Sequence, residues 1–335
     1  MTHLPDQIAF LDEVCRRRGY RMTILDEHSA YLIAVSDGTR EFVTGAGMVN
    51  AYPINNATAA TIATDKAHTY TLARRAGFRV PRGGHFFVTR RFRDLRAPGR
   101  EIHDAVLYAQ SLGFPVFVKP NDGSRGAHAD IVHDENDLIH HCAAMAAEHS
   151  VALVQEVLHG VEFRIVAVDG EALFLYRRDQ GGLVGDGVST VGDLVAAANA
   201  RLVGEGLTPV SPDASYLREA LKQAGLDLAG VPPAGFVLPI TARRNISGGG
   251  RVSGFATDMS DALRDYVRRL SAVVGLRVCG IDVFSRTAEP DPDGFTLLEV
   301  NANPSLSGVA KAGHREEVLR LWERVCALRF AEAPP

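Results

Sequence analysis

Lysine is scarce in this chain of 335 residues. Of its 36 lysine and arginine residues, four are lysine and the other 32 are arginine. Hydrophobic residues make up 46% and charged residues 23% of the chain, which is typical of a folded globular protein and excludes a disordered one. The net charge of −4 gives no reason to expect a nucleic acid or a membrane surface as a partner. Because the chain prefers arginine so strongly, the positions that keep lysine are informative.

Cysteine and long apolar runs are also scarce. The four cysteines lie far apart and form no C-x-x-C pair, so we expect them to be reduced and buried, and a zinc site is disfavoured. No stretch approaches the roughly 20 apolar residues that span a bilayer. The first residues carry early acids and no apolar run, unlike a secretory signal. These absences predict a cytoplasmic protein.

The length of the chain predicts about two domains, and the pattern of apolar residues predicts an α/β (α+β) protein. The first elements expected are a helix at 6–18 and short strands near 21–25, 31–35 and 39–44. Asn56 is then the expected N-cap of one helix that runs to about Ala76. The later elements are strands at 115–120 and 151–156 with a helix at 134–148 between them, a β-hairpin turning at Asp169-Gly170, helices near 190–203, 212–224 and 258–274, strands at 278–284 and 295–302, and a helix around 314–330.

Two carboxylates and an amide are the sharpest chemical feature. Asp282 lies among apolar neighbours in Gly-Ile-Asp-Val-Phe, and Glu299 and Asn301 lie two residues apart on one face of the next strand. Acids gathered in an apolar setting need a counter-charge, which a hard cation such as Mg²⁺ supplies, usually shared with substrate phosphates. The alternative is that each side chain is hydrogen-bonded to nearby backbone.

Lys119 ends the strand Pro-Val-Phe-Val-Lys-Pro, and a loop with Gly123, Ser124 and Gly126 follows. Such a loop can fold its backbone N–H groups over phosphates, while the lysine adds a point charge. Many glycine-rich loops merely connect strands, so that reading stays open. Further on, the strand end at Gln155 offers backbone groups for an adenine edge, and Glu162 offers a carboxylate for ribose hydroxyls. An exposed acid at a turn is the alternative for Glu162.

Two further polar loops are rich in glycine. One contains Gly185-Asp-Gly187, and the other runs from Arg243 to Gly250. Arginines beside such loops suit the binding of phosphate or carboxylate, although surface linkers look much the same. The sequence has no triad-like histidine grouping and no G-x-S-x-G, so hydrolase chemistry has no support.

Taken in order, these motifs resemble the ATP-grasp superfamily of carboxylate–amine ligases. The resemblance covers about 56–315 and rests on Asp65-Lys66, GFPVFVKP with its glycine loop, VQEVLHGVEF, the Asp282 strand and LLEVNANPSLSG. Within the superfamily, GDGVSTVGDL and NISGGG are similar to the ligase portions of cyanophycin synthetase and bifunctional glutathione synthetase. The resemblance implies a short N-terminal α/β domain at 1–60, a small lobe at 61–157 with a linker helix at 56–76, a large lobe with the metal site at 158–330, and a nucleotide between the two lobes.

The resemblance also implies a role for each matching residue. These roles are nucleotide-phosphate binding by Lys66 and Lys119 with Ser124 in the loop, adenine binding by Gln155, Glu156 and Val157, ribose binding by Glu162, catalysis by Arg178, Arg243, Arg244, Asn245 and Ser247, and Mg²⁺ or Mn²⁺ binding by Asp282, Glu299 and Asn301. One position departs from the pattern. The branch usually has an arginine four residues before the asparagine, and this chain has Thr241, so either Arg243 or Arg244 takes over that role.

The activity that the resemblance implies is ATP-dependent amide formation through an acyl phosphate, with a small-molecule carboxylate and a small-molecule amine as substrates. An amino acid or short peptide is expected on at least one side, and a homodimer is the assembly common among similar ligases. Two alternatives stay open: phosphorylation of a small molecule, and a non-catalytic ATP-binding regulator. The sequence identifies neither substrate, and it leaves the role of Lys311 open.

Overall fold

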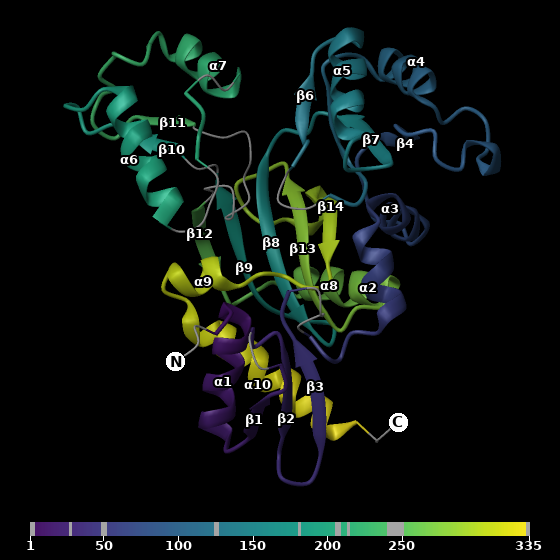
Figure 1. Cartoon of the computed structure of the whole chain (residues 1–335), viewed down its shortest axis with the longest axis vertical. Coiled ribbons are helices and arrows are strands. Elements are labelled where there is room, and N and C mark those ends of the chain that lie inside the picture. Colours follow the sequence, from purple (N-terminus) through teal and green to yellow (C-terminus); the bar gives the residue numbers. More distant parts are fainter. Residues whose placement is uncertain are drawn as a thin grey trace. The chain divides into compact units, whose positions relative to one another are not determined.

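The computed structural model describes residues 4–26, 29–47, 52–123, 127–179, 182–204, 209–212, 215–239 and 251–332 (Figure 1). Contacts divide the chain into two compact units, each built from separate stretches of sequence. Unit 1 consists of Met1–His85, Leu158–Tyr176 and Gly254–Pro335, and unit 2 consists of Phe86–Val157 and Arg177–Ser253. The three-part domain division expected from the sequence stays a prediction. No helix within the described ranges is long and apolar enough to cross a membrane.

A small antiparallel sheet forms the N-terminal part of unit 1. Helix α1 ends at Gly19, whose φ of 71° is a left-handed conformation that favours glycine. Strands β1, β2 and β3 then pair in that order, and α1 packs against the C-terminal helix α10. The expected helix and three strands are confirmed. Their bounds are α1 Asp6–Arg18, β1 Arg21–Ile24, β2 Leu32–Ser36, β3 Glu41–Gly45 and α10 Arg315–Ala331.

The single helix expected after Asn56 is wrong: the segment forms two helices. Asn56 is the N-cap, as expected, since its Oδ1 accepts from Ala59 N at 2.8 Å. Helix α2 (Ala57–Thr64) then stops, because Asp65 is extended and its Oδ1 accepts from the backbone N–H of His68 at 2.8 Å. An aspartate side chain that caps the next turn competes with helix continuation. Helix α3 (Lys66–Arg75) therefore begins at Lys66.

A five-stranded sheet is the largest among the described residues, with strand order β12-β9-β8-β13-β14. The expected hairpin is confirmed: β8 and β9 are joined by Asp169 and Gly170, whose φ angles of 54° and 78° suit a two-residue turn. Strand β13 runs antiparallel to both β8 and β14. The elements are β8 Val161–Val168, β9 Glu171–Asp179, β12 Arg251–Ala256, α8 Asp261–Val274, β13 Val278–Ser285, η3 Pro292–Gly294, β14 Thr296–Asn301 and α9 Ser307–Lys311.

Unit 2 contains a four-stranded sheet with strand order β4-β7-β5-β6, and β5 runs antiparallel to both neighbours. Its core joins alternate residues of β5 and β7 to the apolar faces of α4 and α5. A second small core packs α6 and α7 on the two-stranded sheet β10-β11. The elements are β4 Gly83–Phe87, η1 Arg93–Leu95, α4 Ile102–Leu112, β5 Val116–Pro120, β6 Asp130–Val132, α5 Glu135–Met145, β7 Val151–Glu156, β10 Gly182–Val184, α6 Val191–Gly204, α7 Ser215–Ala224 and β11 Val237–Pro239.

Candidate functional site

The predicted acids lie on one face of the five-stranded sheet. Asp282 on β13 is the register partner of Glu299 on β14, and directly paired residues place their side chains on the same face. Asn301 lies two residues after Glu299 and donates from Nδ2 to Glu299 Oε1 at 3.0 Å. Glu162 on β8 pairs with Phe284, two residues from Asp282, and so shares this face. The structure therefore brings together the three predicted metal ligands and the predicted ribose acid.

Arg164 supplies a counter-charge that the sequence reasoning missed. It is the β8 partner of Asp282, and its guanidinium donates from Nε to Asp282 Oδ1 and from Nη2 to Oδ2, the latter at 2.6 Å. Its Nη2 also lies 3.9 Å from Glu299 Oε1. Asp282 is 1% exposed and Arg164 is 8% exposed, so the ion pair is buried. The available signal was an arginine between apolar residues of a strand, two residues after Glu162 and so on the same face.

The charge state of Arg164 follows from this pairing. Burial acts to lower the pKa of the guanidinium, but the charge and hydrogen bonds of Asp282 offset burial, and the net direction of the pKa is upward. Arg164 is therefore a permanent positive charge beneath the acids.

Gly280 provides the room that Arg164 needs. A Cβ at position 280 would lie 3.1 Å from Arg164 Nη1, 3.2 Å from Arg164 Cδ and 2.9 Å from Pro304 Cβ. The glycine two residues before Asp282 thus lets the long arginine side chain cross the face of β13.

Lys66 brings a second positive charge to the acids. Its Nζ lies 3.8 Å from Glu299 Oε2, and the residue is 7% exposed. Its position follows from the Asp65 cap, which makes Lys66 the first residue of α3. One of the four lysines of the chain is therefore placed at the predicted metal ligands.

The chemistry of these side chains fits a hard divalent cation. No three His, Cys, Asp or Glu side chains of the described ranges form a metal cluster by themselves. Asp282, Glu299 and Asn301 offer two carboxylates and an amide oxygen, which suits Mg²⁺ because this ion usually keeps several waters and takes substrate phosphates as its other ligands. Arg164 donates hydrogen bonds to both carboxylate oxygens of Asp282, so Glu299 and Asn301 offer the more accessible oxygen ligands for a cation. Magnesium binding stays a prediction.

In unit 2, pairing of β5 with β7 brings two predicted nucleotide contacts to one face. Lys119 pairs with Leu153, and Phe117 pairs with Gln155, so Lys119 and Gln155 share the face opposite the core of this sheet. Gln155 is 3% exposed, and β7 ends at Glu156 directly before Val157.

Other predicted residues are placed less fully. Arg178 lies on β9 and is 8% exposed. Lys311 is an exposed residue at the end of α9. The remaining predicted residues, Ser124, Arg243, Arg244, Asn245 and Ser247, lie outside the described residues, as does Thr241.

Comparison with known proteins gives the family. No protein-family model matches the chain. The chain is 28% identical over 303 residues to a glutathione biosynthesis bifunctional protein of Mannheimia succiniciproducens, an alignment that covers 87% of this chain and 38% of the relative. It is 30% identical over 258 residues to a cyanophycin synthetase of Nostoc sp., which covers 72% of this chain and 26% of the relative. Among solved structures, the bifunctional glutathione synthetase from Pasteurella multocida matches with a TM-score of 0.57 and 23% identity, over 91% of this chain and 40% of that one. The chain belongs to the ATP-grasp superfamily.

The expected α/β ATP-grasp fold and the expected relationship to bifunctional glutathione synthetase and cyanophycin synthetase are confirmed. This ATP-grasp chain spans about two fifths or less of the length of these relatives.

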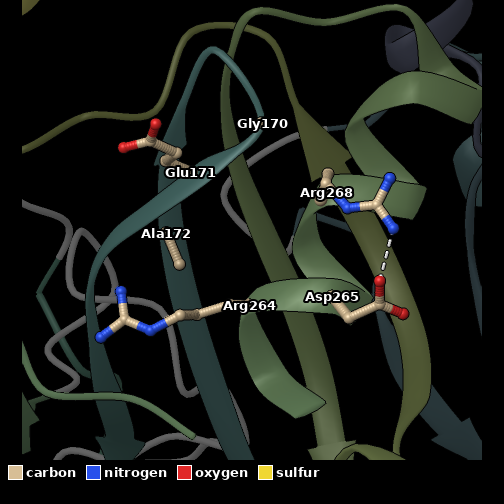
Figure 2. Close-up of a pocket in the computed structure, with 6 residues that line it drawn as sticks. All are labelled: Gly170, Glu171, Ala172, Arg264, Asp265 and Arg268. Atoms are coloured by element: carbon tan, nitrogen blue, oxygen red, sulfur yellow. Dashed lines mark hydrogen bonds and ion pairs between the residues drawn. The ribbon is translucent and has the colours of Figure 1, made fainter. Parts of the chain in front are cut away.

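A cavity of about 320 Å³ lies elsewhere on unit 1, between the β8–β9 turn and α8 (Figure 2). Figure 2 shows Arg268 turned toward Asp265, and the two form an ion pair of 2.5 Å. The lining residues are Gly170, Glu171, Ala172, Arg264, Asp265 and Arg268. None of these six is among the predicted site residues of this ATP-grasp chain.

Proposed function

We propose that the chain is an ATP-dependent carboxylate–amine ligase, which joins the carboxylate of one small molecule to the amine of another. The observation that carries the proposal is the single sheet face that holds Asp282, Glu299 and Asn301 together with the buried Arg164 and with Lys66. The relatives are named for the synthesis of glutathione and cyanophycin, which supports amide formation as the reaction class. An amino acid or short peptide is the proposed substrate on at least one side.

The reaction proceeds in two transfers. A carboxylate oxygen of the first substrate attacks the γ-phosphorus of ATP, the bond to the bridging oxygen breaks, and ADP leaves. The amine of the second substrate then attacks the acyl carbon, the carbon–oxygen bond to phosphate breaks, and the amine nitrogen loses a proton as the amide forms. Such chemistry depends mainly on positioning and on neutralising phosphate charge.

The chain's own residues supply both requirements. In this proposal Lys66 and Lys119 bind nucleotide phosphates as point charges, and the backbone and side chains from Gln155 to Val157 bind the adenine. Glu162 accepts from the ribose hydroxyls. The residues proposed to act on the transferred phosphate and the reacting carboxylate are Arg178, Ser124, Arg243, Arg244, Asn245 and Ser247.

Asp282, Glu299 and Asn301 are the residues that would hold Mg²⁺, or Mn²⁺ in its place. When bound, the ion supplies charge neutralisation on the phosphate oxygens. Arg164 orients Asp282 on the sheet face through two hydrogen bonds to its carboxylate.

The experiment is a screen for ADP release with pairs of amino acids, coupled to mass spectrometry for a product at the summed mass minus water. The variant Glu299→Gln keeps the shape of the side chain, and we expect it to reduce ADP release by at least about 100-fold while the protein stays folded. Glu289→Gln, at an exposed acid between β13 and β14, is the matched control.

Each result bears on the proposal. ADP release by folded Glu299→Gln at the wild-type rate contradicts the assignment of Glu299. ADP formation that needs no amine and yields a phosphorylated product indicates small-molecule phosphorylation instead. ATP binding without ADP formation in the full screen indicates a regulator.

We also propose a cytoplasmic homodimer. Size-exclusion chromatography with light scattering tests the dimer, and a mass of one chain at micromolar concentration refutes it.

A further inference from the structure

Tyr70 connects the helix of Lys66 to the strand of Glu299. It lies on α3 four residues after Lys66, so the two side chains share one face of the helix. Tyr70 is 5% exposed, and its hydroxyl donates to the backbone carbonyl of Leu298 at 2.5 Å. The acceptor is thus the residue directly before Glu299.

The acceptor residue is the bulged position of β14. Asp282 pairs with Glu299, but the next residue of β13, Val283, pairs with Leu297, so Leu298 is an extra residue in the strand. A bulge leaves its extra residue out of the regular ladder and re-aims the neighbouring side chains. The Tyr70 hydroxyl gives the carbonyl of this extra residue a hydrogen-bond partner.

We propose that Tyr70 is a positioning residue, which holds the Lys66 ammonium beside Glu299 so that the lysine can bind nucleotide phosphates. This inference rests on the proposed function. Lys66 is 7% exposed, so its side chain has little room to move and the place of its Nζ depends on where its helix turn is held. Asp65 fixes the start of that turn, and the bond from Tyr70 to Leu298 ties the following turn to the strand. The 3.8 Å separation of Lys66 and Glu299 follows from these two attachments.

Loss of the hydroxyl leaves the rest of the packing in place. The backbone N–H of Leu297 donates to Arg79 O at 2.9 Å, so the same stretch of β14 keeps a second attachment to the segment after α3. We therefore expect Tyr70→Phe to fold, with its aromatic ring still buried, while α3 loses its fixed position on the bulge.

The experiment compares dissociation constants for MgATP by isothermal titration calorimetry. We expect Tyr70→Phe to weaken ATP binding about tenfold, the equivalent of one buried hydrogen bond. Tyr266→Phe is the matched control, because the Tyr266 hydroxyl is buried in the same unit and forms no hydrogen bond with the described residues. Its affinity for ATP should equal that of the wild type.

A double-mutant cycle separates positioning from a general structural effect. If Tyr70 acts through Lys66, then Tyr70→Phe in a Lys66→Met background has little further effect on the ATP dissociation constant. Tyr70→Met, which also lacks the hydroxyl, must repeat the result, so the test does not depend on one variant folding.

The outcomes are distinct. Failure of the wild-type protein to bind MgATP refutes the proposed function itself. If the wild type binds, then unchanged affinity in folded Tyr70→Phe or Tyr70→Met, or an equal loss with and without Lys66, overturns the positioning role of Tyr70.

Discussion

Replacement of Arg164 by methionine tests the central ion pair of the sheet. Methionine keeps much of the length and apolar contact of the arginine stem but removes the charge and the two hydrogen bonds to Asp282. Asp282 would then be a carboxylate at 1% exposure, with Glu299 as another negative side chain on the same face. A buried charge that loses its partner is strongly unfavourable.

The expected loss is large compared with the stability of an ordinary domain. Removal of one partner of a buried ion pair costs about 3–5 kcal/mol, against a total unfolding free energy of about 5–15 kcal/mol. Only 10% of the Arg164 side chain and 2% of the Asp282 side chain are exposed, so the cost of breaking a buried ion pair applies here and not the smaller cost of breaking a surface pair. At about 2–4 °C per kcal/mol, the melting temperature should fall by about 10 °C.

The assay is thermal denaturation followed by circular dichroism at neutral pH, on Arg164→Met, Asp282→Asn and the double variant. Asp282→Asn alone should also destabilise, because it leaves the Arg164 charge buried. The double variant removes both charges and should recover part of the loss, giving a coupling energy of about 2 kcal/mol or more. Arg164→Lys, which keeps the charge but not the two-bond geometry, should fall between Arg164→Met and the wild type.

Two results would refute the reasoning. One is a melting temperature for Arg164→Met within about 2 °C of the wild type, the range of a typical surface substitution. The other is a double variant whose loss equals the sum of the two single losses, which would mean that the side chains do not act as a pair.

Two further predictions concern residues that support this sheet. Gly280→Ala should destabilise unit 1 by about 1–3 kcal/mol, because the added Cβ would lie 2.9 Å from Pro304 Cβ and 3.1 Å from Arg164 Nη1. Urea denaturation should show a lower midpoint, and an unchanged midpoint would contradict this steric contact. At the β8–β9 turn, the hydrogen bond from Arg277 Nε at 2.7 Å lowers the pKa of Asp169 below its ordinary value of 3.8. The ion pair therefore stabilises the fold fully above pH 3.8, and this stabilisation is lost as the pH falls through the lowered pKa. Asp169→Asn keeps a residue that tolerates the positive φ. Between pH 4 and about 2, we expect the melting temperature of this variant to fall less than that of the wild type, by an amount worth less than about 1 kcal/mol because the pair is partly exposed. Parallel plots of melting temperature against pH for the two proteins would exclude a contribution of this pair to the pH dependence.

Local patterns in the sequence were sufficient to predict several features of the fold. The alternation around Asp282 and the two-residue spacing of Glu299 and Asn301 predict strand faces correctly, since side-chain direction in a strand depends only on position along it. The turn at Asp169-Gly170 was also predicted, because few dipeptides accept two positive φ angles. The nucleotide roles of Lys119 and Gln155 remain predictions, although pairing of β5 and β7 places both on one face.

The sequence by itself determined which residue types lie on each strand face, where the hairpin turns and which superfamily the chain belongs to. Only the tertiary structure decided that Arg164 pairs with Asp282, that β14 carries a bulge at Leu298, and that Lys66 lies beside Glu299. The physical reason is range. Alternation and turns depend on neighbouring residues. Strand register, the room left by Gly280 and the contact between two charges depend on separate segments, which meet only when the chain is folded. Arg164 and Asp282, for example, lie 118 residues apart in the sequence.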